Sequence, residues 1–196
     1  MDKSRLDHAL ALIDEANAPD PHQLFVRGAL RPKEQAHAEL MTEWVLRLRP
    51  DASEELQLAA RAHHIRRWAI PRANYPAGRQ GYLEWKTELR RRHAADLREI
   101  LLAAGYPELS IARACSILLK HGLTRDPEVR TFEDALCLVF LETQFEETAA
   151  KIERSKMITA LRMSIFKMSE QGRQAALALV LPEHLRELLL EAARVG

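Results

Sequence analysis

The sequence is short of the features that mark several classes of protein. Cysteine occurs only at Cys115 and Cys137, without CxxC spacing, so we expect two buried free thiols and a reducing compartment. Neither charge dominates, because 29 Lys and Arg against 28 Asp and Glu give a net charge of +1, which is no strong signal for nucleic acid. No apolar run approaches the length of a membrane span, and the first residues are amphipathic, unlike a signal peptide. We therefore expect a cytoplasmic protein with no membrane partner.

Repeats of fixed period and convincing strand patterns are also absent. Apolar residues instead recur at spacings of three and four almost throughout the chain. This pattern predicts an all-α protein, a single compact multi-helix domain over 1–196, with loops at 18–32 and 69–81. We expect the helices at about 4–17, 33–49, 54–68, 81–104, 107–122, 131–145, 155–168 and 170–194, the last interrupted at Pro182.

Histidines fall on the predicted inner faces of several of these helices. His37 shares a stripe with Leu40 and Trp44, and the pair His63-His64 comes near the end of the third helix. A buried imidazole needs a hydrogen-bond, ionic or metal partner. His37 alone could be a satisfied core histidine, and His64 could be solvated at the helix end, so each gains weight as a ligand only from its neighbours.

Asp134, in the segment "FEDALCLV", has two open interpretations. Thr131 and Asp134 have the spacing of a capping box, and an acid in the first turn of a helix is favoured by the helix dipole. Alternatively, Asp134 contributes a carboxylate to a site on the inner face of the sixth helix.

The order of these residues resembles the HD-domain superfamily of metal-dependent phosphohydrolases. That superfamily is all-helical and has a His, a later His-Asp doublet after an apolar run, and a final Asp on a buried helix. His37, His63 and Asp134 match three of these positions, whereas His64 stands where the superfamily has its doublet Asp. The resemblance implies an HD-like fold with a metal site at His37, His63, His64 and Asp134.

The HD-like core would cover about 33–145, with the C-terminal helices, 155–195, packed on it.

A second resemblance spans most of the chain. The stretches "AARAHHIRRWAIPR", "YPAGRQGYLEWKTELRRRHA", "GLTRDPEVRTFEDALCLVFLE" and "KMSEQGR" are similar to an uncharacterised bacterial and eukaryotic domain-of-unknown-function family. Its hallmark is the tract 64–68 together with His93 and Glu133-Asp134, which implies a shared site without naming its activity.

Three imidazoles and one carboxylate suit a divalent transition metal such as Zn, Fe, Co, Ni or Mn. A metal with an open position lowers the pKa of a bound water and supplies a nucleophile at neutral pH. Glu133 and His64 are the candidate catalytic groups beside it. Glu133 could equally be an exposed acid in the first turn of its helix.

Arginines follow directly after the histidine pair. Guanidinium groups bind phosphate oxygens well, and aromatic residues in the same segment could stack on a ligand, although they could also be core anchors. The alternative for the arginines is a solvated basic face. We expect the phosphate- or substrate-binding residues to be Arg66, Arg67, Arg72, Arg79 and His93, with Arg90, Arg91 and Arg92 as further candidates.

These observations favour a metal-dependent phosphohydrolase that acts on a nucleotide or another small phosphate ester. The main alternative is a non-catalytic HD-like module that binds a phosphorylated ligand or a protein partner. A third is oxidative chemistry at iron, for which His93 and His121 would be additional ligands.

Overall fold

A computed structural model describes residues 3–194 of the chain, so positions 1, 2, 195 and 196 of the predicted domain lie outside it. Within this range the fold is helical apart from one short hairpin, which confirms a single compact all-α domain. The elements are α1 (Lys3–Asn17), β1 (Gln23–Val26), β2 (Ala29–Pro32), α2 (Lys33–Leu48), α3 (Glu54–Arg61), α4 (Gly78–Ala103), α5 (Glu108–Leu118), α6 (Pro127–Thr143), α7 (Phe145–Lys151), α8 (Arg154–Lys167), α9 (Glu170–Leu177) and α10 (Glu183–Ala193), with 3-10 turns at Arg67–Ala69 and Arg72–Asn74.

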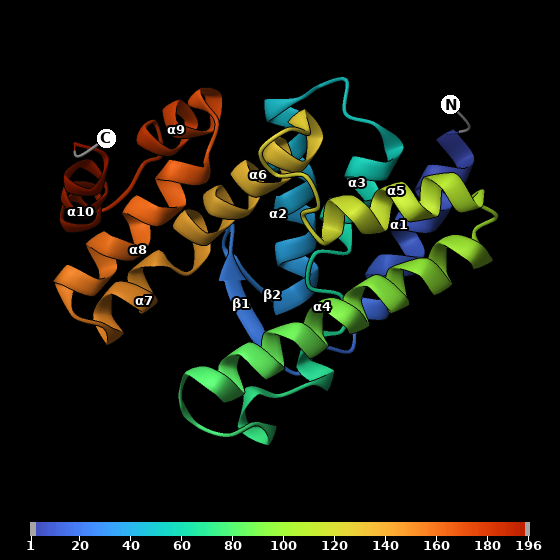
Figure 1. Cartoon of the computed structure of the whole chain (residues 1–196), viewed down its shortest axis with the longest axis horizontal. Coiled ribbons are helices and arrows are strands. Elements are labelled where there is room, and N and C mark those ends of the chain that lie inside the picture. Colours follow the sequence, from blue (N-terminus) through green and yellow to red (C-terminus); the bar gives the residue numbers. More distant parts are fainter. Residues whose placement is uncertain (1–2, 195–196) are drawn as a thin grey trace.

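Helices α2 and α6 pack against each other at the centre of the molecule (Figure 1). On one side lie α1, α3, α4 and α5, with α3 contacting both α2 and α5. On the other side lie α7 to α10, of which α7, α8 and α9 contact α6. The inner face of α6 is apolar, with Phe132 and Leu138 fully buried. This burial agrees with the run of apolar residues at 135–141 of the sequence. None of the helices in residues 3–194 combines the length and the apolar character that crossing a membrane requires.

The segment predicted as a loop at 18–32 contains an antiparallel hairpin, β1 paired with β2. Arg27 and Gly28 form its two-residue connection, and both have positive φ, 52° and 81°. Positive φ at both central residues is the geometry of the tight turn that suits the twist of paired strands. The prediction missed this hairpin because strands of four residues are too short for alternation to stand out from the flanking prolines.

The third predicted helix ends earlier than expected. Helix α3 stops at Arg61, and the chain continues as turns in which Arg66 takes a left-handed conformation with φ 50° and ψ 31°. That conformation costs a non-glycine residue about 1 kcal/mol. The amide of Arg66 donates to Asn17 Oδ1 at 3.0 Å, and Asn17 is fully buried, so tertiary contacts hold the turn. The histidine pair therefore lies on irregular backbone rather than on a helix.

Helix α6 begins four residues before the predicted start. Asp126 is its N-cap, accepting hydrogen bonds from the amides of Glu128 and Val129, and Pro127 occupies its first turn. Thr131 and Asp134 consequently lie inside the helix, and the predicted capping box between them is wrong. Thr131 instead donates its hydroxyl to the carbonyl of Pro127.

Candidate metal and anion site

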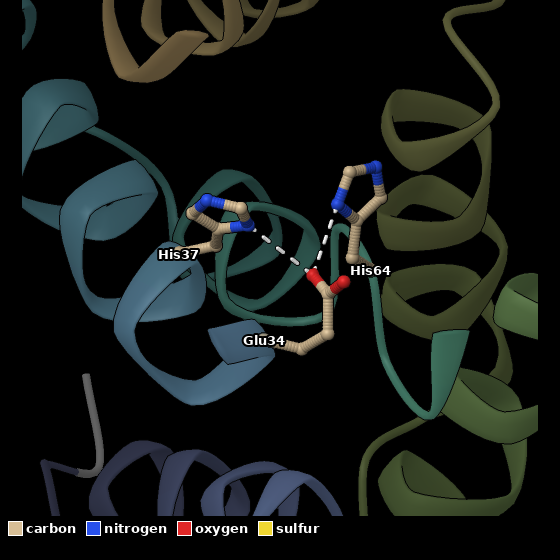
Figure 2. A group of neighbouring side chains, drawn as sticks. All are labelled: Glu34, His37 and His64. Carbon is tan, nitrogen blue, oxygen red and sulfur yellow. Dashed lines mark hydrogen bonds and ion pairs between the residues drawn. The ribbon is translucent and has the colours of Figure 1, made fainter. Parts of the chain in front are cut away.

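Three side chains with metal-ligating atoms meet beside the first turn of α2: Glu34, His37 and His64 (Figure 2). Glu34 Oε2 lies 3.3 Å from His37 Nδ1 and 3.1 Å from His64 Nδ1, and one ligand atom from each residue lies within 4.8 Å of the other two. Glu34 and His37 are almost fully buried, whereas the side chain of His64 is 21% exposed. The group is therefore closed on the side of the core and reachable through His64.

The local sequence explains why these atoms converge. Glu34 and His37 are three residues apart on α2, a spacing that places two side chains on one face of a helix. Glu34 is also in the first turn of α2, where the helix dipole favours a carboxylate. Its amide donates to Asp20 Oδ2 at 2.9 Å, which fixes the start of the helix. The turns after α3 then bring His64 to the carboxylate.

Arg67 determines how His64 is protonated. The guanidinium Nη1 is 3.2 Å from His64 Nε2 and can only donate, so Nε2 accepts and the ring proton is on Nδ1, which donates to Glu34. Burial lowers the pKa of His64 to about 4, despite the hydrogen bond to Glu34. Burial alone would raise the pKa of Glu34, but hydrogen bonds from His37 and His64 outweigh it and hold that pKa well below its usual range. A neutral imidazole thus faces an ionised carboxylate.

Both ring nitrogens of His37 have partners. Nδ1 lies 3.3 Å from Glu34 Oε2, and Nε2 lies 3.3 Å from Thr143 Oγ1. The Thr143 hydroxyl also lies 2.7 Å from the carbonyl of Val139, which fixes its position on α6. His37 and His64 thus meet the same oxygen of Glu34, the arrangement that a cation shared by the three side chains would need.

The donor set also fits. One carboxylate oxygen and two imidazole nitrogens, with coordination positions left for water or substrate, are typical of catalytic rather than structural transition-metal sites. Thr143 would act as an outer partner that fixes the ring of His37. His64 Nδ1 can bind a metal only if its proton moves to Nε2, which faces the donor Arg67. The side chain of Arg67 is 33% exposed, and its Nε also lies 3.9 Å from Glu34 Oε1, so metal binding and the present Arg67 contacts compete.

A cavity of about 220 Å³ opens next to this group and shares His64 with it. Arg67 forms one wall, with its guanidinium 4.8 Å from the centre of the Trp85 ring, and Trp85 is fixed by a hydrogen bond to the carbonyl of Ile70. Among residues 3–194, no acidic side chain lines the cavity. Its lining residues are His63, His64, Arg67, Tyr82, Trp85, Lys86, Leu89, Arg90, His93, Leu118, Leu119, Lys120 and Leu136.

The histidines of the cavity wall are held neutral. The rings of His63 and His64 are stacked with centroids 3.7 Å apart, and His63 also meets the edge of Phe132. Burial lowers the pKa of His63 well below its usual value and lowers that of His93 to about 3. The charge of the cavity therefore comes from its Arg and Lys side chains, and it is positive.

Asp134 does not join the metal-capable group. Its carboxylate accepts hydrogen bonds from the amide of Ser169, at 2.9 Å, and from the Ser169 hydroxyl, so it anchors the start of α9. Gly172 lies so close that a Cβ there would be 2.5 Å from Asp134 Cγ. Burial raises the pKa of Asp134. The carboxylate predicted as a ligand is thus occupied by the packing of α9 on α6.

His63 and Glu133 are also placed differently from the prediction. His63 lies in the cavity wall but outside the group of three ligands. Glu133 is buried and forms an ion pair with Lys120, so it is neither an exposed first-turn acid nor a free carboxylate. Of the predicted metal ligands, the structure brings together His37 and His64, and it adds Glu34.

The structure places only some of the predicted phosphate-binding residues in the cavity. Arg67 and His93 line the cavity, and Arg90 joins them. Arg72 instead donates to the carbonyls of Tyr75 and Pro76, both at 2.9 Å, which holds the loop before α4 together.

Arg66 lies near Asp96 at 3.4 Å, outside the cavity lining, and Arg79 is exposed and outside it as well. Arg91 and Arg92 pair with Glu88 and Asp96 on their own helix. His121, the further candidate for an iron site, is exposed and outside the group of three ligands.

Sequence reasoning missed Glu34, Lys86 and Lys120. For Glu34 a signal was present, since an acid three residues before a histidine at the start of an amphipathic helix shares its face. Lys86 and Lys120 carried no comparable signal, because α4 and the end of α5 meet only in the folded chain.

Comparison with known protein families gives a match over most of the chain. The chain matches a family described as a domain of unknown function (DUF4202) over residues 7–189. No curated protein and no solved structure matches it. The resemblance to HD-domain phosphohydrolases stays a prediction, whereas the predicted relationship to a domain-of-unknown-function family is confirmed. Because the match covers nearly the whole described structure, the chain belongs to the DUF4202 family.

Proposed function

We propose that the protein hydrolyses small phosphate esters with one divalent transition-metal ion held by Glu34, His37 and His64. The observation that carries this proposal is that His64 belongs both to the group of three ligands and to the wall of a positively charged cavity. A phosphoryl group held in the cavity would therefore lie beside the ion. The metal is one of the set Zn, Fe, Co, Ni and Mn, which this donor set suits.

The bound metal would supply a Lewis acid and a nucleophile of lowered pKa. The remaining roles would fall to the protein's own side chains. Arg67, Lys86 and Arg90 would neutralise the phosphate oxygens, and Glu133 would hold Lys120 in place through their ion pair.

The test combines metal content with turnover. Protein dialysed against each of the five metals should retain close to one ion per chain by elemental analysis and release inorganic phosphate from some member of a phosphate-ester panel. Glu34→Gln should lose both the ion and the activity. Glu43→Gln is the matched control, because Glu43 lies on the same helix and pairs with Arg27 on the surface. Equal metal retention in the two variants would refute the site.

A second candidate function has one observation in its favour. The hydrogen bonds from Arg67 to His64 and from His64 to Glu34 form a continuous chain without a metal. This arrangement favours a non-catalytic module that binds a phosphorylated ligand. Such a module would bind phosphate esters with an affinity that chelators do not change, and it would release no phosphate with any of the five metals.

A further inference from the structure

The cavity contains a polar atom that the protein itself does not use. His93, on α4, is 5% exposed and lines the cavity. Its Nδ1 is buried and has no hydrogen-bond partner among residues 3–194. A buried polar atom without a partner costs about 1–3 kcal/mol, so such atoms are rare unless something outside the chain satisfies them.

The chemistry of the ring limits what kind of partner is missing. An imidazole nitrogen accepts or donates one hydrogen bond, according to the tautomer. A group that can do both satisfies Nδ1 in either tautomer. A hydroxyl is such a group, because it has one donor proton and two acceptor lone pairs.

The charges around the cavity narrow the choice of partner. Arg67, Lys86 and Arg90 disfavour an ammonium group near His93. They favour the dianion of a phosphate monoester, whose charge they neutralise. The partner of Nδ1 is then a neutral group elsewhere on the ligand, and a hydroxyl is the simplest one that a compact phosphate ester carries.

Building on the proposed function, we infer that the ligand is a hydroxylated phosphate ester, a sugar or polyol phosphate, whose hydroxyl forms a hydrogen bond with His93 Nδ1 while its phosphate meets the Arg and Lys side chains of the same cavity. The cavity volume of about 220 Å³ suits a compact ligand of this kind. His93 is a specificity-determining residue, because a site built to pair a hydroxyl discriminates strongly against an analogue without it.

The experiment compares two probes that differ only in this respect. Ribose 5-phosphate carries ring hydroxyls, whereas cyclopentylmethyl phosphate has a phosphate on a similar five-membered ring and no hydroxyl. Calorimetry in the presence of a chelator removes any contribution from a metal. The wild-type protein should bind the sugar phosphate at least about tenfold more tightly, the ratio expected when a buried polar atom is left without its hydrogen-bond partner.

Variants of His93 identify the atom responsible. His93→Leu should weaken binding of ribose 5-phosphate to the level of the hydroxyl-free probe and leave the latter unchanged or tighter. His93→Asn, which can place a carbonyl oxygen near the position of Nδ1, should keep part of the preference. His121→Leu, at an exposed histidine outside the cavity, is the control and should change neither affinity.

The outcomes separate the two proposals. Equal affinity of the wild type for both probes, or an equal loss for both in His93→Leu, would overturn the role of His93. If His93→Leu does not fold, the wild-type ratio and His93→Asn still decide. If the protein prefers the hydroxylated probe but releases no phosphate with any metal, this inference still holds and only the proposed hydrolase activity is refuted. If neither probe binds, the proposed class of ligand is refuted as well.

Discussion

Two buried carboxylates on the central pair of helices have opposite surroundings. Glu34, on α2, faces two imidazoles beside a positively charged cavity. Asp134, on α6, faces the amide and hydroxyl of Ser169 and is covered by Gly172. Both are almost fully buried, and burial acts to raise the pKa of both. Only for Glu34 do the neighbouring groups reverse that effect.

The difference shows what turns a buried acid into a candidate ligand. The donors to Asp134 belong to the cap of α9, and a backbone amide cannot give up its proton to make room for a cation. The donors to Glu34 are imidazole nitrogens, whose protons can be replaced by a metal ion. Burial alone therefore does not identify a functional carboxylate, whereas the exchangeability of its partners does.

The largest expected effect is on metal binding at Glu34. Glu34→Gln replaces a charged ligand by a neutral amide of the same shape, so we expect metal affinity to fall at least about 100-fold. Asp134→Asn should leave the affinity unchanged. Competition against a chromophoric chelator measures both. Similar losses of metal affinity in the two variants would contradict the distinction drawn between the two carboxylates.

The next effect is on stability near Asp134. Gly172→Ala places a methyl group 2.5 Å from Asp134 Cγ, so we expect a loss of about 2 kcal/mol in the free energy of unfolding. Without that close approach, alanine would instead stabilise α9 by up to about 1 kcal/mol. Urea denaturation gives the sign directly. Gln174→Ala, at an exposed position of the same helix, is the control and should change stability by less than about 0.5 kcal/mol.

Asp134→Asn should cost less, about 1 kcal/mol, because the amide oxygen still accepts from Ser169 and the desolvated charge is removed. The loss should shrink as the pH rises above about 4. The native carboxyl has a raised pKa, so it holds its proton more tightly than the unfolded chain does, and the wild type loses that stabilisation on deprotonation. Urea titrations at pH 4 and pH 7 measure the trend, and a loss that grows with pH would contradict it.

The smallest effect has opposite signs for two ligands. Arg67→Met removes the donor that opposes a proton on His64 Nε2, so metal affinity should rise, by about threefold. The same substitution removes a cation from the cavity and should weaken binding of ribose 5-phosphate. Chelator competition and calorimetry test the pair. A fall in both affinities would mean that Arg67 supports the metal group instead of competing with it.

Much of the helical framework was predictable, since period-3.6 patterns and prolines placed most helices close to their observed ranges. The predictions failed where local signals were weak or outweighed. The hairpin after α1 depends on two residues with positive φ, and the early end of α3 depends on the contact between Arg66 and Asn17. Neither the turn nor the contact follows from periodicity.

The candidate site was predictable to a similar extent. His37, His64, Arg67 and His93 stood out because polar residues on apolar faces or beside a histidine pair need partners. Glu34 was overlooked in favour of Asp134, although both lie on helices of the right kind. The choice between two buried acids depends on which donors reach them, and those donors come from 30 and 35 positions away along the chain.

The sequence by itself determined an all-α chain, its helical stripes and the residue types of a candidate site. The tertiary structure decided which of these residues meet. It pairs Asp134 with the cap of α9, turns His64 toward Glu34 and leaves His93 Nδ1 without a partner. Hydrophobic periodicity is a property of neighbours in sequence, whereas hydrogen bonds and coordination depend on distances of a few ångströms between segments that only packing brings together.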